Sequence, residues 1–239
     1  MSFVVPAVLP KDKRELDERI ELFAAIPEVT RIQIDAIDGK FVAPATWPYT
    51  NFGEFERMRA AGDMLPHLGK IQYEVDLMCL EGDKQVPIWL ALGATRLIFH
   101  VETSPDVPRM LERARDESGA HANFLPTLVS FGISISIDTN LAFIESCLSF
   151  VEFVQFMGIA RIGKQGQPFD ERVLKNIRTF RARHPDMPVQ VDGGVSLDSA
   201  PQLAALGVKN IVVGSALIKS PDPAQTYKTF EAFQNPYEA

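Results

Sequence analysis

Short apolar runs alternate with amphipathic segments along the whole chain. The apolar runs are rich in Val, Ile and Phe and have the length and composition of buried strands. They predict strands at 3–9, 31–34, 73–78, 96–99, 132–137, 151–157, 189–191 and 211–213. Between them, apolar residues at helical spacing predict helices at 11–26, 52–65, 86–92, 107–118, 140–146, 170–183 and 221–233. A further helix is expected to end at Leu206 and to be capped by Ser196 or Asp198.

Alternation of this kind specifies a parallel sheet, and eight units favour closure into a barrel over an open doubly wound sheet. No dinucleotide-type glycine fingerprint follows the first strand, which further disfavours the open sheet. The prediction is a single α/β domain, a (β/α)8 TIM barrel covering residues 1–239. Pro6 has no N–H to donate, so we expect it near an irregular end of the first strand. The long loop at 36–51 is expected to form a functional lid or wall.

Composition and charge narrow the class of protein. Apolar residues make up 46% of the chain and charged residues 23%, enough to bury a full core. The formal net charge of −7 gives no basic excess, so neither a nucleic acid nor an anionic membrane is an expected partner. Pro6 and Pro10 interrupt the first apolar run, so neither a signal peptide nor a membrane span is predicted there. Cys79 and Cys147 have no metal-type spacing and indicate a reduced, cytoplasmic protein.

Two glycine turns near the end of the chain give the strongest functional signal. Gly193 and Gly194 follow the seventh predicted strand, and Gly214 and Ser215 follow the eighth. Each turn precedes a helix, so free backbone N–H groups and positive helix dipoles gather at one place. The loops after the seventh and eighth strands form the usual phosphate pocket of an eight-stranded barrel. The sequence therefore predicts phosphate binding at these turns.

Three carboxylates are expected to converge at the mouth of the barrel. Asp35, Asp76 and Asp192 end the second, third and seventh predicted strands. The carboxyl ends of barrel strands face the active site, and three aspartates there are more than turn formation requires. His100 ends the fourth strand, where it can orient a neighbouring carboxylate such as Asp76 or Glu102.

Six segments resemble the ribulose-phosphate 3-epimerase family, barrels that interconvert ketopentose phosphates. The segments are IQIDAIDGKFVAPAT (32–46), YEVDLM (73–78), IFHVE (98–102), FMGIARIGKQGQPF (156–169), VQVDGGV (189–195) and VVGSA (212–216). The resemblance implies a phosphorylated sugar as ligand and two catalytic aspartates on opposite faces of it, matched here by Asp35 and Asp192. One aspartate removes the proton alpha to the ketone and the other returns a proton to the far face, while a divalent metal steadies the enediolate.

The chain departs from the family pattern at the metal site. Family members hold the metal with the two aspartates and two histidines, and those histidine positions carry Gln33 and Asp76 here. The oxygen ligands that remain are Gln33, Asp35, Asp76 and Asp192, and they suit magnesium or manganese better than zinc or iron. The same residues are also compatible with a site that holds no metal. Without a cation the carboxylates repel one another, so at least one pKa is expected to rise.

The resemblance also implies a substrate pocket. The expected pocket residues are Gln33, Met78, His100, Met157, Arg161 and Lys164. Gly166 matches the end of the family's sixth loop and joins the predicted phosphate contacts. Arg161 and Lys164 are either solvated loop charges or ligands for a second anionic group. Ala7 and Pro10 occupy the positions of two family serines.

Three functions remain open on the sequence. The first is epimerisation or isomerisation of a sugar phosphate by Asp35 and Asp192. The second is a lyase or aldolase reaction on another phosphorylated ligand, with Lys164 as a conceivable Schiff-base lysine. The third is a sugar-phosphate-binding barrel without catalysis, favoured by the lost histidines and serines. A homo-oligomer is expected, because barrels of this size commonly associate through their loops or helices.

Overall fold

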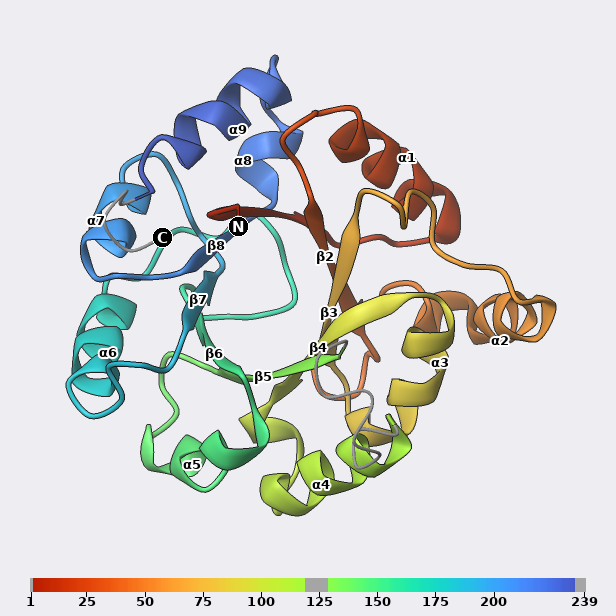
Figure 1. Ribbon diagram of the computed structural model, residues 1–239, viewed down its shortest axis with the longest axis horizontal. Helices are drawn as coiled ribbons and strands as arrows, with labels where there is room; N and C mark the ends of the chain where they lie inside the picture. Colours follow the sequence, from red (N-terminus) through yellow and green to blue (C-terminus); the bar gives the residue numbers. More distant parts are fainter. Residues whose placement is uncertain (1, 119–128, 235–239) are drawn as a thin grey trace.

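Eight parallel strands form a closed barrel in the computed structural model, which describes residues 2–118 and 129–234 (Figure 1). The strands are β1 (Val4–Val8), β2 (Arg31–Ile37), β3 (Gln72–Met78), β4 (Ala94–His100), β5 (Ser130–Ile135), β6 (Phe153–Met157), β7 (Val189–Asp192) and β8 (Asn210–Val213). Each strand pairs with the next one along the chain, and β8 pairs with β1. The predicted (β/α)8 TIM barrel is confirmed. The predicted domain also includes residues 1, 119–128 and 235–239, which lie outside the described part of the chain.

Helices surround the barrel on its outer face (Figure 1). They are α1 (Lys13–Ala24), α2 (Phe52–Ala61), α3 (Val86–Ala91), α4 (Val107–Glu117), α5 (Ala142–Glu145), α6 (Arg172–Arg181), α7 (Ala200–Ala205), α8 (Ser215–Ile218) and α9 (Pro223–Glu231). Short 3-10 turns are η1 (Tyr49–Asn51), η2 (Gly82–Gln85), η3 (Val101–Thr103) and η4 (Leu148–Phe150). In α1, the predicted apolar stripe of Leu16, Ile20 and Phe23 is buried, and the Asp12 carboxylate caps the first turn by accepting from the Glu15 N–H.

Ser196 caps the start of the α7 segment, as one of the two predicted caps. Its hydroxyl accepts from the Ser199 N–H at 3.3 Å, and the Ser199 hydroxyl accepts from the Ser196 N–H at 2.9 Å. The regular helix begins only at Ala200, after the turn at 197–199 that these bonds close.

The position of Pro6 also differs from the expectation. Pro6 lies in the middle of β1, paired with Val213 of β8. Pairing continues on both sides of it, through Val5 with Val212 and Ala7 with Gln33. One missing N–H therefore removes one hydrogen bond from the barrel without ending the strand.

The core divides into an apolar outer layer and a largely polar interior. A large cluster of buried hydrophobic residues fills the space between the strands and the surrounding helices. Val5, Ala7 and Val212 form a small separate cluster on β1 and β8. Buried polar side chains on the other strands hydrogen-bond across the barrel, from Gln33 on β2 to Asp192 on β7, for example. The barrel interior is thus the place where the chemistry-bearing residues meet.

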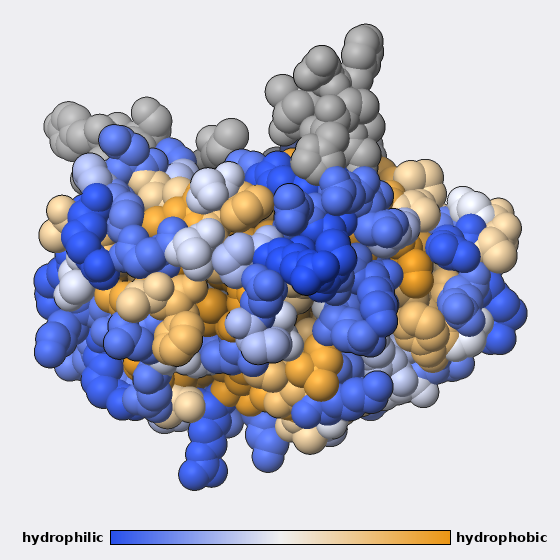
Figure 2. Space-filling model, turned by 90° about the horizontal axis from the view of Figure 1, so that it is seen from below, coloured by the Kyte–Doolittle hydropathy of each residue, from blue (hydrophilic) through white to orange (hydrophobic). Residues whose placement is uncertain are grey.

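The outer surface mixes charged residues with small apolar areas, as the face drawn in Figure 2 shows. Among the residues that the structure describes, no helix combines the length and the apolar character that crossing a bilayer requires.

Candidate active site

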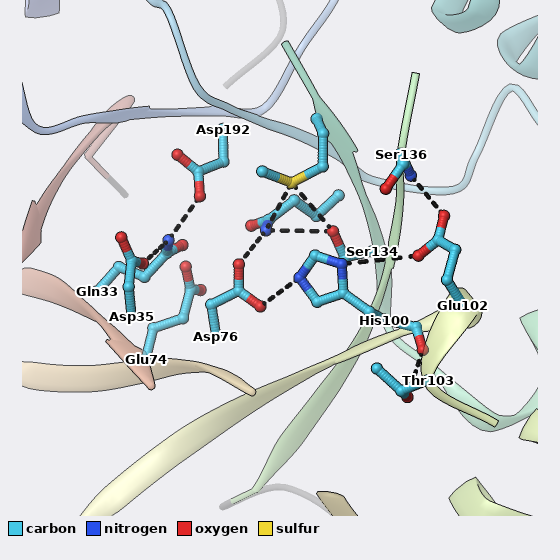
Figure 3. Close-up of polar contacts among 12 residues, drawn as sticks. Gln33, Asp35, Glu74, Asp76, His100, Glu102, Thr103, Ser134, Ser136 and Asp192 are labelled. Atoms are coloured by element: carbon cyan, nitrogen blue, oxygen red, sulfur yellow. Dashed lines mark hydrogen bonds and ion pairs between the residues drawn. The ribbon is translucent and has the colours of Figure 1, made fainter. Parts of the chain in front are cut away.

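Three buried aspartates meet at the carboxyl ends of β2, β3 and β7 (Figure 3). Strand pairing places Asp35 directly beside Asp76, and Asp192 is the last residue of β7. One carboxylate oxygen from each aspartate can be chosen so that all three lie within 4.8 Å of one another. The structure therefore brings together the three carboxylates that strand-end positions suggested.

Gln33 lies between two of these aspartates. Its Nε2 donates to Asp35 Oδ1 at 2.8 Å and to Asp192 Oδ2 at 2.9 Å (Figure 3). The side chain is fully buried and lies beneath the pocket, not on its wall. One neutral amide thus holds the two aspartates at a fixed separation.

His100 lies beside the third aspartate. Its Nε2 is 2.9 Å from Asp76 Oδ1, and its Nδ1 is 3.7 Å from Glu102 Oε2. The ring of Phe41, from the long loop after β2, packs against the imidazole with ring centroids 5.5 Å apart. Like Gln33, the imidazole contacts an aspartate and does not line the pocket.

Burial and neighbouring charge shift the pKa values of this cluster. Burial, followed by the charges of Asp192 and Asp76, raises the pKa of Asp35 well above its ordinary value. Burial, followed by the charge of Asp76, raises the pKa of Asp192 to about 7. For His100, burial favours the neutral ring, but the charge and hydrogen bond of Asp76, with those of Glu102, outweigh it and raise the pKa to about 10.

These shifts predict that the metal-free protein loses stability as the pH rises. A carboxyl group whose pKa is raised from 3.8 to about 7 in the folded state stabilises the fold only while it is protonated. An imidazole raised from 6.5 to about 10 contributes stability that is complete below pH 6.5 and is lost by about pH 10. Both groups act in the same direction, so we expect the free energy of unfolding to fall between about pH 4 and pH 10.

Urea unfolding in the presence of EDTA measures this dependence. Asp192→Asn removes one titrating group and should flatten the fall between about pH 4 and pH 7. A stability that rises over the same range would contradict the prediction.

A pocket joins the aspartates to the two glycine turns. Asp35 and Asp192 line one part of it, and Gly193, Gly194, Gly214 and Ser215 line the other. The expected pocket residues Met78, Met157 and Lys164 also line it, as does Gly166. Arg161 is exposed and does not line this pocket, so the pocket position expected for it is not supported.

The turn after β7 requires glycine for geometric reasons. Gly194 has φ +68°, and a Cβ there would lie 2.6 Å from the Phe169 Cα. Gly193 has φ +102°, and a Cβ there would lie 2.8 Å from Ile159 Cγ1. The backbone of this turn therefore lies directly against the loop that follows β6.

Two loops meet above the pocket. A Cβ at Gly163 would lie 2.1 Å from Val42 Cγ1, so the loop after β6 packs closely on the loop after β2. The ring of Phe41 also packs on His100, so the loop at 36–51 lies beside the site, but none of its residues lines the pocket. Gln165 reaches from the same loop toward Gly214, and its Nε2 donates to the Ala7 carbonyl at 3.4 Å.

Sequence reasoning missed three buried residues beneath the aspartates: Glu74, Gln155 and Gln190. Gln155 Nε2 donates to Asp76 Oδ2 at 2.9 Å, and Gln190 Nε2 donates to Glu74 Oε1 at 2.6 Å. The alternation of side chains along a strand could have identified two of them. Glu74 and Gln190 each precede a site aspartate by two residues, so they share its face of the strand.

Comparison with known proteins places this geometry in a family. The model of the ribulose-phosphate 3 epimerase family matches residues 3–218. The chain belongs to this family.

Family relatives match almost the whole chain. The ribulose-phosphate 3-epimerase of Aquifex aeolicus is 27% identical over 237 residues, covering 95% of both chains. That of Synechocystis is 30% identical over 230 residues, covering 93% of this chain and 90% of the relative. The crystal structure of 3-keto-L-gulonate-6-phosphate decarboxylase from Vibrio cholerae has a TM-score of 0.68 at 10% identity, covering 97% and 96% of the two chains, and shares the fold. Its named relatives make this chain a member of an isomerase family acting on carbohydrate phosphates.

The donor set of this epimerase-family site fits a divalent cation. The three aspartate oxygens are close enough to bind one ion together, and all three are hard ligands. Gln33, in contrast, presents its N–H groups to the aspartates, and its Oε1 lies 3.3 Å from Gln190 Nε2. Asp35, Asp76 and Asp192 could therefore hold a metal without an imidazole ligand.

Proposed function

We propose that this protein is a sugar-phosphate epimerase in which Asp35 and Asp192 transfer protons at the carbon alpha to a ketone. The observation that carries the proposal is their placement. Both carboxylates line the pocket that also contains the Gly193–Gly194 and Gly214–Ser215 turns. A phosphate bound at the turns would direct the sugar carbons toward the aspartates.

The raised pKa values support acid/base work near neutral pH. A group whose pKa is close to the working pH can both accept and donate a proton. Asp192, with a pKa of about 7, is the proposed base in one direction, and Asp35, whose pKa burial and the neighbouring aspartates raise well above its ordinary value, is the proposed acid. The base removes the alpha proton, the C–H electrons form an enediolate, and the acid delivers a proton to the other face. The roles exchange in the reverse direction.

The proposed metal site is the aspartate cluster itself. Asp35, Asp76 and Asp192 would hold magnesium or manganese, which supplies positive charge where the enediolate becomes negative. Gln33 and His100 would then orient the aspartate ligands, because each of them contacts an aspartate directly.

Titration of Mn²⁺ into EDTA-stripped protein tests this site. We expect a single site in the wild type and at least a tenfold loss of affinity in Asp76→Ala, because one of three carboxylate ligands is removed. Asp186→Ala, an exposed aspartate in the turn after α6, is the matched control. Equal affinity in Asp76→Ala and the wild type would place the ion elsewhere.

The function itself is tested by proton exchange. Ketose phosphates incubated with the protein in D₂O should gain deuterium at the alpha carbon and yield the epimer. A ligand that binds with neither exchange nor epimer would point to the sugar-phosphate-binding role.

One observation favours a second candidate, a lyase or aldolase reaction. Lys164 lines the pocket, where its amine would meet a carbonyl substrate. Borohydride trapping of a substrate on Lys164 would support this reaction over epimerisation.

A further inference from the structure

The floor of the site is one hydrogen-bonded cluster with Gln190 at its centre. Gln190 lies on β7 two residues before Asp192 and is fully buried. Its Nε2 lies 2.6 Å from Glu74 Oε1, 2.9 Å from Gln155 Oε1 and 3.3 Å from Gln33 Oε1. One amide nitrogen thus faces three acceptor oxygens that come from β2, β3 and β6.

The direction of this amide follows from its neighbours. Glu74 Oε2 accepts from Arg96 Nε at 2.6 Å, and its other oxygen, Oε1, is the acceptor that faces Gln190. A reversed Gln190 would place its Oε1 among three other acceptors with no proton between them. In the observed direction, Gln190 Oε1 is buried and has no hydrogen-bond partner among the described residues, which costs less than the reversed arrangement would.

Gln190 in turn determines how two other amides point. Because the oxygens of Gln33 and Gln155 face Gln190, the nitrogens of both amides face the aspartates. Gln33 Nε2 donates to Asp35 and Asp192 (Figure 3). Gln155 Nε2 donates to Asp76 Oδ2. All three aspartates therefore receive N–H donors from below.

We propose that Gln190 is a positioning residue that sets the direction of the Gln33 and Gln155 amides. Through them it determines where the aspartate oxygens lie and which ligands a cation meets. The N–H donors hold the carboxylate oxygens in place and compensate part of their mutual repulsion. They also keep the Gln33 oxygen away from a bound cation, which is left with carboxylate ligands and positions open to substrate. The effect on turnover rests on the proposed epimerase function; the amide directions do not.

The side-chain amide signals of ¹⁵N-labelled protein report these directions without any substrate. In the wild type, the Gln33 and Gln155 NH₂ protons should be protected from exchange with solvent, because they are buried and bonded to carboxylates. Gln190→Met keeps the size of the side chain and removes its donor. Gln225→Met, on an exposed glutamine of α9, is the matched control.

In Gln190→Met we expect exchange of the Gln33 and Gln155 protons to accelerate at least tenfold. Mn²⁺ affinity should increase about fivefold, since Gln33 can then turn its oxygen toward the ion at lower cost. The kcat for epimerisation should fall about tenfold with KM changed less than about twofold, because the phosphate turns are untouched.

A second variant covers the case in which Gln190→Met does not fold. Gln190→Glu has the same length, and its carboxyl oxygens would accept from Gln33 and Gln155 whether ionised or sharing a proton with Glu74. Both amides should then turn, and their NH₂ signals should shift. Unchanged signals in a folded Gln190 variant would overturn the proposal. Changed signals in a protein without epimerase activity would support the positioning role and reject the function.

Discussion

Asp192→Asn and Asp35→Asn should each reduce epimerisation by about 10³-fold while the protein keeps its fold. Each substitution removes a group that accepts or donates the transferred proton. The Asn oxygen can still accept from Gln33 Nε2, so the bridge between the two positions remains. Loss of a buried carboxylate from a cluster of like charges also relieves repulsion, so neither variant is expected to be less stable than the wild type.

The two variants should differ in which epimer of the substrate exchanges its alpha proton with solvent. In D₂O, a single variant keeps the aspartate on one face of the sugar. It can still remove and replace the alpha proton of one epimer from that face, without inverting the carbon. Deuterium gain without epimer formation, for opposite epimers in Asp35→Asn and Asp192→Asn, is therefore the expected signature of a two-base mechanism. Proton NMR of the alpha carbon measures both processes.

Asp186→Asn makes the same change at an exposed position and should retain full activity. Full epimerisation by Asp35→Asn or Asp192→Asn would exclude the assigned bases. Loss of exchange from both epimers in both variants would indicate instead that the two aspartates serve the reaction only as metal ligands and transfer no proton themselves.

The strand ends explain why the aspartate cluster could be predicted from the sequence. Asp192 ends β7, Asp35 and Asp76 lie two residues before the ends of β2 and β3, and the closed barrel brings these three strand ends together. The helix periods were similarly informative, although they did not predict α8 as a helix separate from the last one. Local hydrogen bonds such as those of Ser196 decide where a helix begins, and periodicity does not report them.

Two features depended on contacts between distant segments. The directions of the Gln33 and Gln155 amides follow from the ion pair of Arg96 with Glu74, transmitted through Gln190. No local sequence pattern reveals such a series of contacts, although the alternation of side chains along a strand identifies residues that take part in it. The course of the loop after β6 is likewise set by its contact with the loop after β2, which leaves Arg161 in solvent and Lys164 at the pocket.

Ser215→Asp should weaken use of a phosphorylated substrate by about 10²-fold in kcat/KM. Ser215 begins α8 and lines the pocket beside Gly214. Unit charges 4 Å apart near a protein surface repel by about 4 kcal/mol, and solvent screening reduces this to roughly the cost of a 10²-fold loss. An aspartate in the first turn of a helix is itself favourable, so the fold should be retained.

The comparison that isolates charge uses three further measurements. Ser149→Asp adds the same charge at an exposed residue of η4, on the side of the barrel where strands begin, and should leave kcat/KM unchanged. Ser215→Ala removes the hydroxyl without adding charge, and a loss of less than about tenfold is expected, since one hydrogen bond is at stake. The dephosphorylated sugar, a poor substrate, should be affected equally little by Ser215→Asp and Ser215→Ala. If Ser215→Asp reduced turnover of both sugars to the same extent, the β7 and β8 turns would not be where the phosphate binds.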